Sequence, residues 1–136
     1  MRSIGILDSN SGDFFRLACK KLGGLADVRR WNDSSGYDAV IVSADSEIEN
    51  LHVRGNILIV PSGYTRKIEG RCVISYGMSE RDTVTLSSLT EDNMVVALRR
   101  DIVGINGSVI PRQEFPFDWS MSAYNALPIA SALILL

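Results

Sequence analysis

The sequence predicts one α/β domain in which a mostly parallel, Rossmann-like sheet is followed by a small antiparallel β-sheet and a C-terminal apolar helix. Short apolar runs with β-branched residues recur through residues 1–80, which is typical of strands buried on both faces of a parallel sheet. Residues 81–120 change to alternation with period two, as a sheet with one solvated face requires. Residues 121–136 end in an apolar run that predicts the helix.

The first elements are a strand over residues 3–7, a turn and a helix. The strand ends at Asp8, and residues 9–12 are Ser, Asn, Ser and Gly, which favour a turn. Apolar residues then recur at helical spacing, at Phe15, Ala18, Cys19 and Leu22. Gly23 and Gly24 predict the end of this helix, because glycine readily adopts the left-handed conformation that satisfies the last carbonyl groups.

Four further apolar runs predict the remaining strands of the parallel sheet. They lie at residues 26–31, 37–43, 56–60 and 71–76, with one or two helical turns expected within residues 46–51. Right-handed crossovers bring the loops that follow parallel strands to one edge, where open α/β sheets usually bind ligands. The loops at this edge are residues 8–11, 43–45, 62–64 and 76–78. The candidate ligand-binding residues there are Asp8, Ser9, Asn10, Ser11, Ser43, Ser62 and Tyr76.

The second half predicts an antiparallel hairpin and an edge strand. Residues 83–89 and 94–102 form the expected hairpin around a polar turn at residues 90–93. Residues 105–108 mark another turn, and residues 110–117 supply a third strand. Prolines at 111 and 116 favour an edge position for this strand, because proline cannot donate to the ladder.

Composition excludes several classes of function. The net charge is −2 with a pI near 5.3, and the basic residues are scattered, which argues against nucleic-acid binding. No secretory signal is apparent, so we expect a cytoplasmic protein. The apolar run 126–136 is far shorter than the roughly 20 residues that a membrane span needs.

No motif indicates catalysis, a cofactor or a metal. The glycine patterns of phosphate loops and dinucleotide sites are absent, and the loop 8–12 is more typical of a helix cap than of a phosphate cradle. The order and spacing of the five predicted strands superficially resemble those of the response-regulator receiver domain. The acidic pair, the phosphate-accepting aspartate and the lysine of that domain are missing. His52 has no Ser or Cys context that suggests a catalytic pair. Asp45, Glu47 and Glu49 are acidic residues of the kind that complement a helix dipole.

Residues 72–136 resemble the second half of the central domain of the Mur ligases, the ATP-dependent enzymes that build the peptide of peptidoglycan precursors. In that family a strand ends in Tyr-Gly or Phe-Gly, a small antiparallel sheet follows, and a helix opens with His-Asn-x-x-Asn. Here Tyr76-Gly77, the hairpin 83–102 and the segment 124–130, Tyr-Asn-Ala-Leu-Pro-Ile-Ala, match in order and approximate spacing. The resemblance adds Asn125 to the candidate ligand-binding residues, since its counterpart lies near the nucleotide.

The departures from the family pattern limit what the resemblance implies. Met121 and Ser122 stand where the family motif has its histidine and first asparagine, and no phosphate loop with its lysine occurs anywhere in the chain. We therefore expect a non-catalytic cytoplasmic protein that binds a partner protein, such as one acting in cell-wall synthesis, or a small ligand. The alternative is a nucleotide-binding module or enzyme with an unrecognised site at the carboxyl edge of the parallel sheet.

The C-terminal helix suggests self-association. Pro128 is expected to kink the helix or to stand in its first turn, and residues 129–136 are apolar on nearly every side. A helix without a polar face is enclosed by its own domain or covered by a partner. Because complete enclosure is difficult in a chain of 136 residues, we expect a homodimer or other homo-oligomer formed through this helix.

Overall fold

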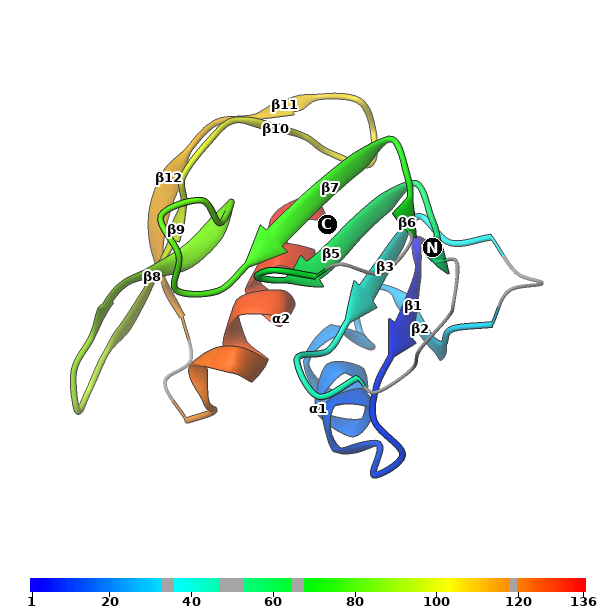
Figure 1. Ribbon diagram of the computed structural model, residues 1–136, viewed down its shortest axis with the longest axis horizontal. Coiled ribbons are helices and arrows are strands. Elements are labelled where there is room, and N and C mark those ends of the chain that lie inside the picture. Colours follow the sequence, from blue (N-terminus) through cyan, green and yellow to red (C-terminus); the bar gives the residue numbers. More distant parts are fainter. Residues whose placement is uncertain (33–35, 47–52, 65–67, 118–119) are drawn as a thin grey trace.

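The computed structural model describes residues 1–32, 36–46, 53–64, 68–117 and 120–136. These residues form one eight-stranded sheet in the order β12-β9-β8-β7-β5-β3-β1-β2, two small two-stranded sheets and two helices (Figure 1). The predicted fold class is confirmed, because a mostly parallel sheet is accompanied by antiparallel strands and by a C-terminal helix. The helical turns expected at residues 46–51 lie outside the described residues from residue 47 onward.

The parallel part of the sheet consists of the five strands that the apolar runs predict. They are β1 (Ser3–Leu7), β2 (Asp27–Arg30), β3 (Ala39–Val42), β5 (Ile57–Pro61) and β7 (Cys72–Tyr76). Their order is β2-β1-β3-β5-β7, so the chain turns back beside β1 after β2 and then proceeds the other way across the sheet. In doubly wound folds this order creates a crevice between the ends of β1 and β3, where ligands bind.

The antiparallel strands continue the same sheet. β8 (Val84–Leu89) begins beside the end of β7 through the parallel pair Tyr76↔Val84, and β9 (Met94–Leu98) returns antiparallel to it. β12 (Gln113–Phe117) is an edge strand, as Pro116 predicts, but the strand expected over residues 110–117 is divided, because Pro111 and Arg112 lie outside the ladders. The predicted continuous strand over residues 94–102 is interrupted after Leu98, because the chain leaves the sheet there.

Two short ladders lie outside the main sheet. β10 (Ile102–Val103) and β11 (Val109–Ile110) form an antiparallel hairpin, while β4 (Val53–Arg54) pairs in parallel with β6 (Ile68–Glu69). The turn expected at residues 105–108 closes the hairpin, with the Gly104 amide donating to the Ser108 carbonyl at 2.8 Å. Gly107 in this turn has φ 85°, a conformation that favours glycine.

Both helices, α1 (Asp13–Leu22) and α2 (Ala123–Leu135), pack on one face of the main sheet and contact each other. α1 ends at the predicted place, but Gly23 is right-handed, with φ −63°. Glycine is required there for another reason, because a Cβ at Gly23 would lie 2.4 Å from the Cys19 carbonyl oxygen. The helix end therefore depends on close backbone packing rather than on the expected left-handed turn.

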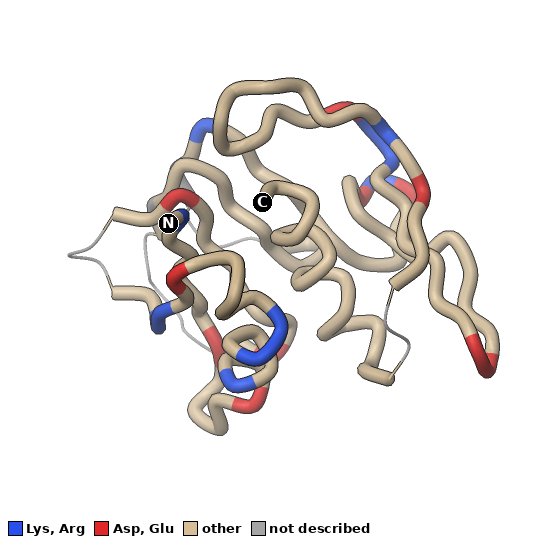
Figure 2. Tube along the Cα trace, turned by 180° about the vertical axis from the view of Figure 1, so that it is seen from behind, with Lys and Arg blue, Asp and Glu red and all other residues tan. Residues whose placement is uncertain are grey.

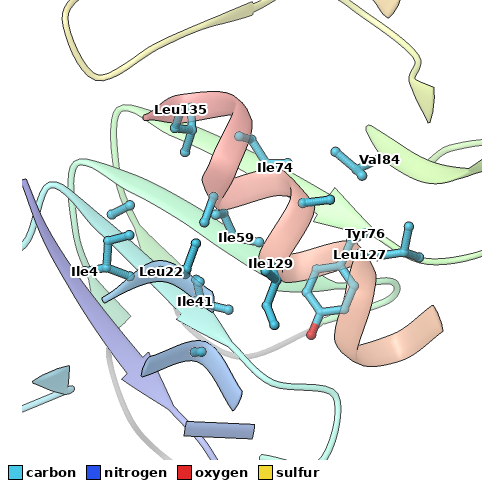
Figure 3. Close-up of a cluster of buried hydrophobic side chains, with 14 of the residues drawn as sticks. Ile4, Leu22, Ile41, Ile59, Ile74, Tyr76, Val84, Leu127, Ile129 and Leu135 are labelled. Atoms are coloured by element: carbon cyan, nitrogen blue, oxygen red, sulfur yellow. The ribbon is translucent and has the colours of Figure 1, made fainter. Parts of the chain in front are cut away.

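Two apolar clusters fill the molecule, one on each face of the sheet. The larger lies between the sheet and the helices, and side chains from β3, β5, β7 and α2 point into it (Figure 3). The smaller covers the opposite face and contains Leu7, Tyr37, Val40, Val42, Val53, Leu58 and Val60. Tyr37 packs over Gly5, where a Cβ would meet the aromatic ring at 3.0 Å. No helix among the described residues is long and apolar enough to cross a membrane.

α2 is enclosed largely by its own domain. Its residues from Ala126 to Ala132 are all buried, whereas Leu133 and Ile134 are half-buried. Pro128 lies in the second turn of this helix rather than in its first. In the second half of α2, Leu133 and Ile134 are the described apolar residues that remain half-buried and accessible to a second copy of the chain.

Candidate functional site

Asp8 joins three elements at the carboxyl edge of the parallel strands. Its carboxylate accepts hydrogen bonds from the Ser9 amide at 2.7 Å, from the Phe15 amide at 2.9 Å and from the Ser43 hydroxyl at 3.0 Å. Phe15 lies in the first turn of α1, whose N-cap residue Gly12 has no side chain that could accept this bond. Asp8 therefore caps α1 and connects it to the ends of β1 and β3.

The remaining loop residues after β1 form a turn above this aspartate. The hydroxyl groups of Ser9 and Ser11 lie 2.9 Å apart, and the Gly12 amide donates to the Ser9 carbonyl at 3.1 Å. Asn10 is exposed at the tip of the turn. The polar groups of Ser9, Ser11 and Gly12 therefore hydrogen-bond within the turn, as is typical of a turn that leads into a helix.

Tyr76 is buried completely beneath the first turns of α2, where its hydroxyl points along the sheet toward β3 (Figure 3). The hydroxyl donates a hydrogen bond of 2.6 Å to the Val42 carbonyl, so the side chain reaches across β5 from the end of β7. Burial raises the pKa of this hydroxyl, and the negative charges of Asp45 and Asp8 raise it further. Tyr76 is therefore a neutral structural donor that braces three strand ends.

The residues around Gly77 explain why glycine follows this tyrosine. A Cβ at Gly77 would lie 2.7 Å from both the Asp82 carboxylate and the Ser62 Cβ. Asp82 is buried, and its carboxylate accepts a hydrogen bond of 2.9 Å from the Ser79 amide. Ser62 is held at the same place, because its amide donates to the Tyr76 carbonyl at 2.8 Å. Glycine at position 77 thus allows the close approach of Ser62 and Asp82 where the chain passes from β7 to β8.

A hollow of about 440 Å³ lies beside this edge, between the loop after β3 and the start of α2. It is lined by Ala44, Asp45, Ser122, Tyr124 and Asn125. Asp45 is exposed and Asn125 is half-buried, and neither side chain makes a hydrogen bond or ion pair with another of the described residues. The first amides of α2 also lack partners within the helix, as at every helix N-terminus. The hollow therefore offers a carboxylate, an amide, a hydroxyl and an aromatic ring.

The structure places the eight predicted residues at four locations. Asp8 and Ser43 are bonded to each other at the strand ends, where the Tyr76 hydroxyl binds the neighbouring Val42 carbonyl, and Asn125 lines the adjacent hollow. Ser62 belongs to the β7–β8 junction, while Ser9, Asn10 and Ser11 form the turn before α1. Asp45, Ser122 and Tyr124 complete the hollow without having been selected from the sequence. Position after a buried strand indicated Asp45, but only the folded chain brings it to α2.

The described residues include no group of His, Cys, Asp and Glu side chains that could hold a metal ion. His52, Glu47 and Glu49 lie outside the part of the chain that the structure describes. Comparison of the chain with protein-family models, with curated proteins and with solved structures gave no match. The candidate site must therefore be interpreted from its own chemistry.

Proposed function

We propose that this protein is a non-catalytic cytoplasmic protein that binds a small polar ligand in the hollow between Asp45 and Asn125. The observation that carries this proposal is the meeting of two polar side chains, about 80 residues apart in sequence, that have no partner among the described residues and lie beside the β1–β3 crevice. Ligands of doubly wound sheets bind at such crevices. The hydrogen bonds of Asp8 support a non-catalytic role for the cluster around it, because they hold the strand ends and the first turn of α1 together.

The charge of the hollow favours one class of ligand over another. Among the described residues of its lining, Asp45 alone is charged, and the negative charges of Asp45 and Asp8 both act on the Tyr76 hydroxyl. A free polyphosphate would be repelled there. Hydroxyl or amino groups would instead donate to Asp45 and Asn125, while the exposed Tyr124 ring offers an apolar surface, as sugars and amino sugars require.

Thermal unfolding in the presence of candidate ligands tests this proposal. A ligand at one hundred times its dissociation constant stabilises the folded state by about 2.7 kcal/mol, which raises the Tm by several degrees. We expect the Tm to rise with one or more neutral or amino sugars, and we expect this rise in Tm to be lost in Asp45→Asn and Asn125→Ala. Asp92→Asn, an exposed aspartate in the β8–β9 turn, is the matched control and should respond as the natural chain does.

The same experiment separates the alternative function. A rise in Tm with ATP or other nucleotides in the presence of Mg²⁺, lost in Asp45→Asn, would favour a nucleotide-binding module over the proposed sugar-binding protein. A rise with UDP-sugars would agree with the relationship to the Mur ligases that we propose from the order of Tyr76-Gly77, the hairpin and Asn125. Absence of any shift across sugars, nucleotides and UDP-sugars would contradict ligand binding in this hollow.

We also propose that the end of α2 takes part in contacts with a second copy of the chain or with a partner protein in cell-wall synthesis. An apolar groove of about 370 Å³ lies there, lined by Ile110, Gln113, Phe115, Pro116, Phe117, Leu133 and Ile134. The edge strand β12 forms one wall of this groove and α2 the other. Exposed apolar surface of this kind favours association.

A further inference from the structure

A second hollow, of about 430 Å³, lies on the antiparallel part of the sheet, over β8, β9 and β12. It occupies the face turned away from α2, because Leu86, Val96 and Phe115 on these strands point into the core beneath that helix. Thr85 and Ala97 are buried at its floor, while Arg99, Arg112 and Glu114 stand around it exposed. Figure 2 shows basic and acidic stretches close together in the part of the chain that contains the antiparallel strands.

The two arginines lie just beyond one end of the β9–β12 ladder, and both line the same hollow. Leu98 and Gln113 form the last pair of this ladder, and Arg99 follows Leu98 in the chain while Arg112 precedes Gln113. The antiparallel part of this acidic protein therefore places two positive charges beside one hollow.

Both arginines are held by their backbones, while their guanidinium groups remain available. The Arg99 amide donates to the Thr83 carbonyl at 2.8 Å, and the Arg112 amide donates to the Asp101 carboxylate at 2.9 Å. Neither guanidinium group makes an ion pair or hydrogen bond with any other described residue. Two donor groups without partners thus project from fixed points beside the same hollow.

The acidic residue of the hollow does not neutralise the arginine pair. Glu114 accepts a hydrogen bond of 2.7 Å from the Ser87 hydroxyl, on the side of the hollow formed by β8. The lining consequently has one more positive than negative charge, with its positive end at the arginines. The Ser87–Glu114 end offers hydrogen bonds to a neutral polar group. This arrangement suits a molecule with an oxyanion at one end and hydroxyl groups at the other.

We propose that this hollow binds a small molecule through a phosphate or carboxylate group that bridges Arg99 and Arg112. Guanidinium groups bind such oxyanions through charge-assisted, often bidentate, hydrogen bonds. A bound anion would neutralise the two positive charges beside the hollow. The site is independent of the hollow beside Asp45, and neither proposal requires the other.

Binding of simple anions, followed through backbone amide NMR signals at constant ionic strength, tests the proposal. Inorganic phosphate and glycerol phosphate form one arm, and acetate and citrate form the other. We expect saturable shifts confined to the amides of β8, β9, β12 and their adjoining residues, and the arm that saturates at lower concentration identifies the anion class. Arg99→Gln and Arg112→Gln should each weaken binding about tenfold or more.

Arg100→Gln is the matched control, because Arg100 is the sequence neighbour of Arg99 and its guanidinium group is engaged with the Arg81 carbonyl at 2.8 Å. This variant should bind the anion as the natural chain does. The proposal is overturned if no probe saturates, if the double variant binds normally, or if Arg100→Gln loses binding to the same extent.

Discussion

Tyr76 combines complete burial with one short hydrogen bond, to the Val42 carbonyl two strands away. The protonated hydroxyl is neutral, and its pKa is raised by burial and by Asp45 and Asp8. A raised pKa means that the folded state holds the proton more tightly than the unfolded state. The resulting stability is fully present below the ordinary tyrosine pKa of about 10 and is lost as the pH rises beyond it.

We therefore expect Tyr76→Phe to change both the stability and its dependence on pH. At neutral pH the variant should lose about 1 kcal/mol, because the Val42 carbonyl is left without its donor. Above about pH 10 the advantage of the natural chain should shrink by up to about 1.4 kcal/mol per pH unit. Urea unfolding from neutral to alkaline pH measures both effects.

The exposed Tyr124 provides the matched control for this experiment, since its side chain is 57% exposed. Tyr124→Phe should follow the natural chain at every pH. Parallel stability curves for the natural chain and Tyr76→Phe through the alkaline range would contradict the role assigned to the buried hydroxyl.

At the scale of elements, local sequence patterns predict the strands well. They do not predict which distant segments pair or meet in the folded chain. Buried strands such as β3 and β5 are continuous apolar runs, which the sequence displays directly. The pairing of β8 with β7 has no local signal, because it depends on the Gly77 junction. The same limit applies to the site: Asp8 was identifiable at a strand end, whereas the meeting of Asp45 with Asn125 required the path of α2.

The end of α2 carries the prediction that belongs to this scale. Pro116 has no amide hydrogen, which hinders pairing of a further strand along β12, so association should occur through side chains in the apolar groove. We expect light scattering to show a dimer for the natural chain and a monomer for Ile134→Glu. Val73→Glu, at an exposed apolar residue of β7 outside the groove, should remain a dimer. A natural chain that is monomeric at high micromolar concentration would contradict self-association.

At the scale of the whole molecule, the parallel part, the antiparallel part and α2 are joined by one sheet and one core. β8 extends the sheet from β7, and α2 packs against β3 and β5 as well as β7 and β8. The larger apolar cluster therefore runs without interruption from Ile41 to Val96. Elements that share one core and one sheet lose their packing together, so we expect a single unfolding transition.

Two buried residues of this cluster, one in the parallel part and one in the antiparallel part, test that expectation. Ile41→Val removes a methyl group in β3 and Val96→Ala removes two in β9, and each should lower the free energy of unfolding by about 1 to 3 kcal/mol. If the chain is one cooperative unit, each variant shifts the same transition, and the calorimetric and van't Hoff enthalpies agree. A Val96→Ala variant that melts in two steps, with amide protection lost first in β8, β9 and β12, would instead establish the antiparallel part as a separate folding unit.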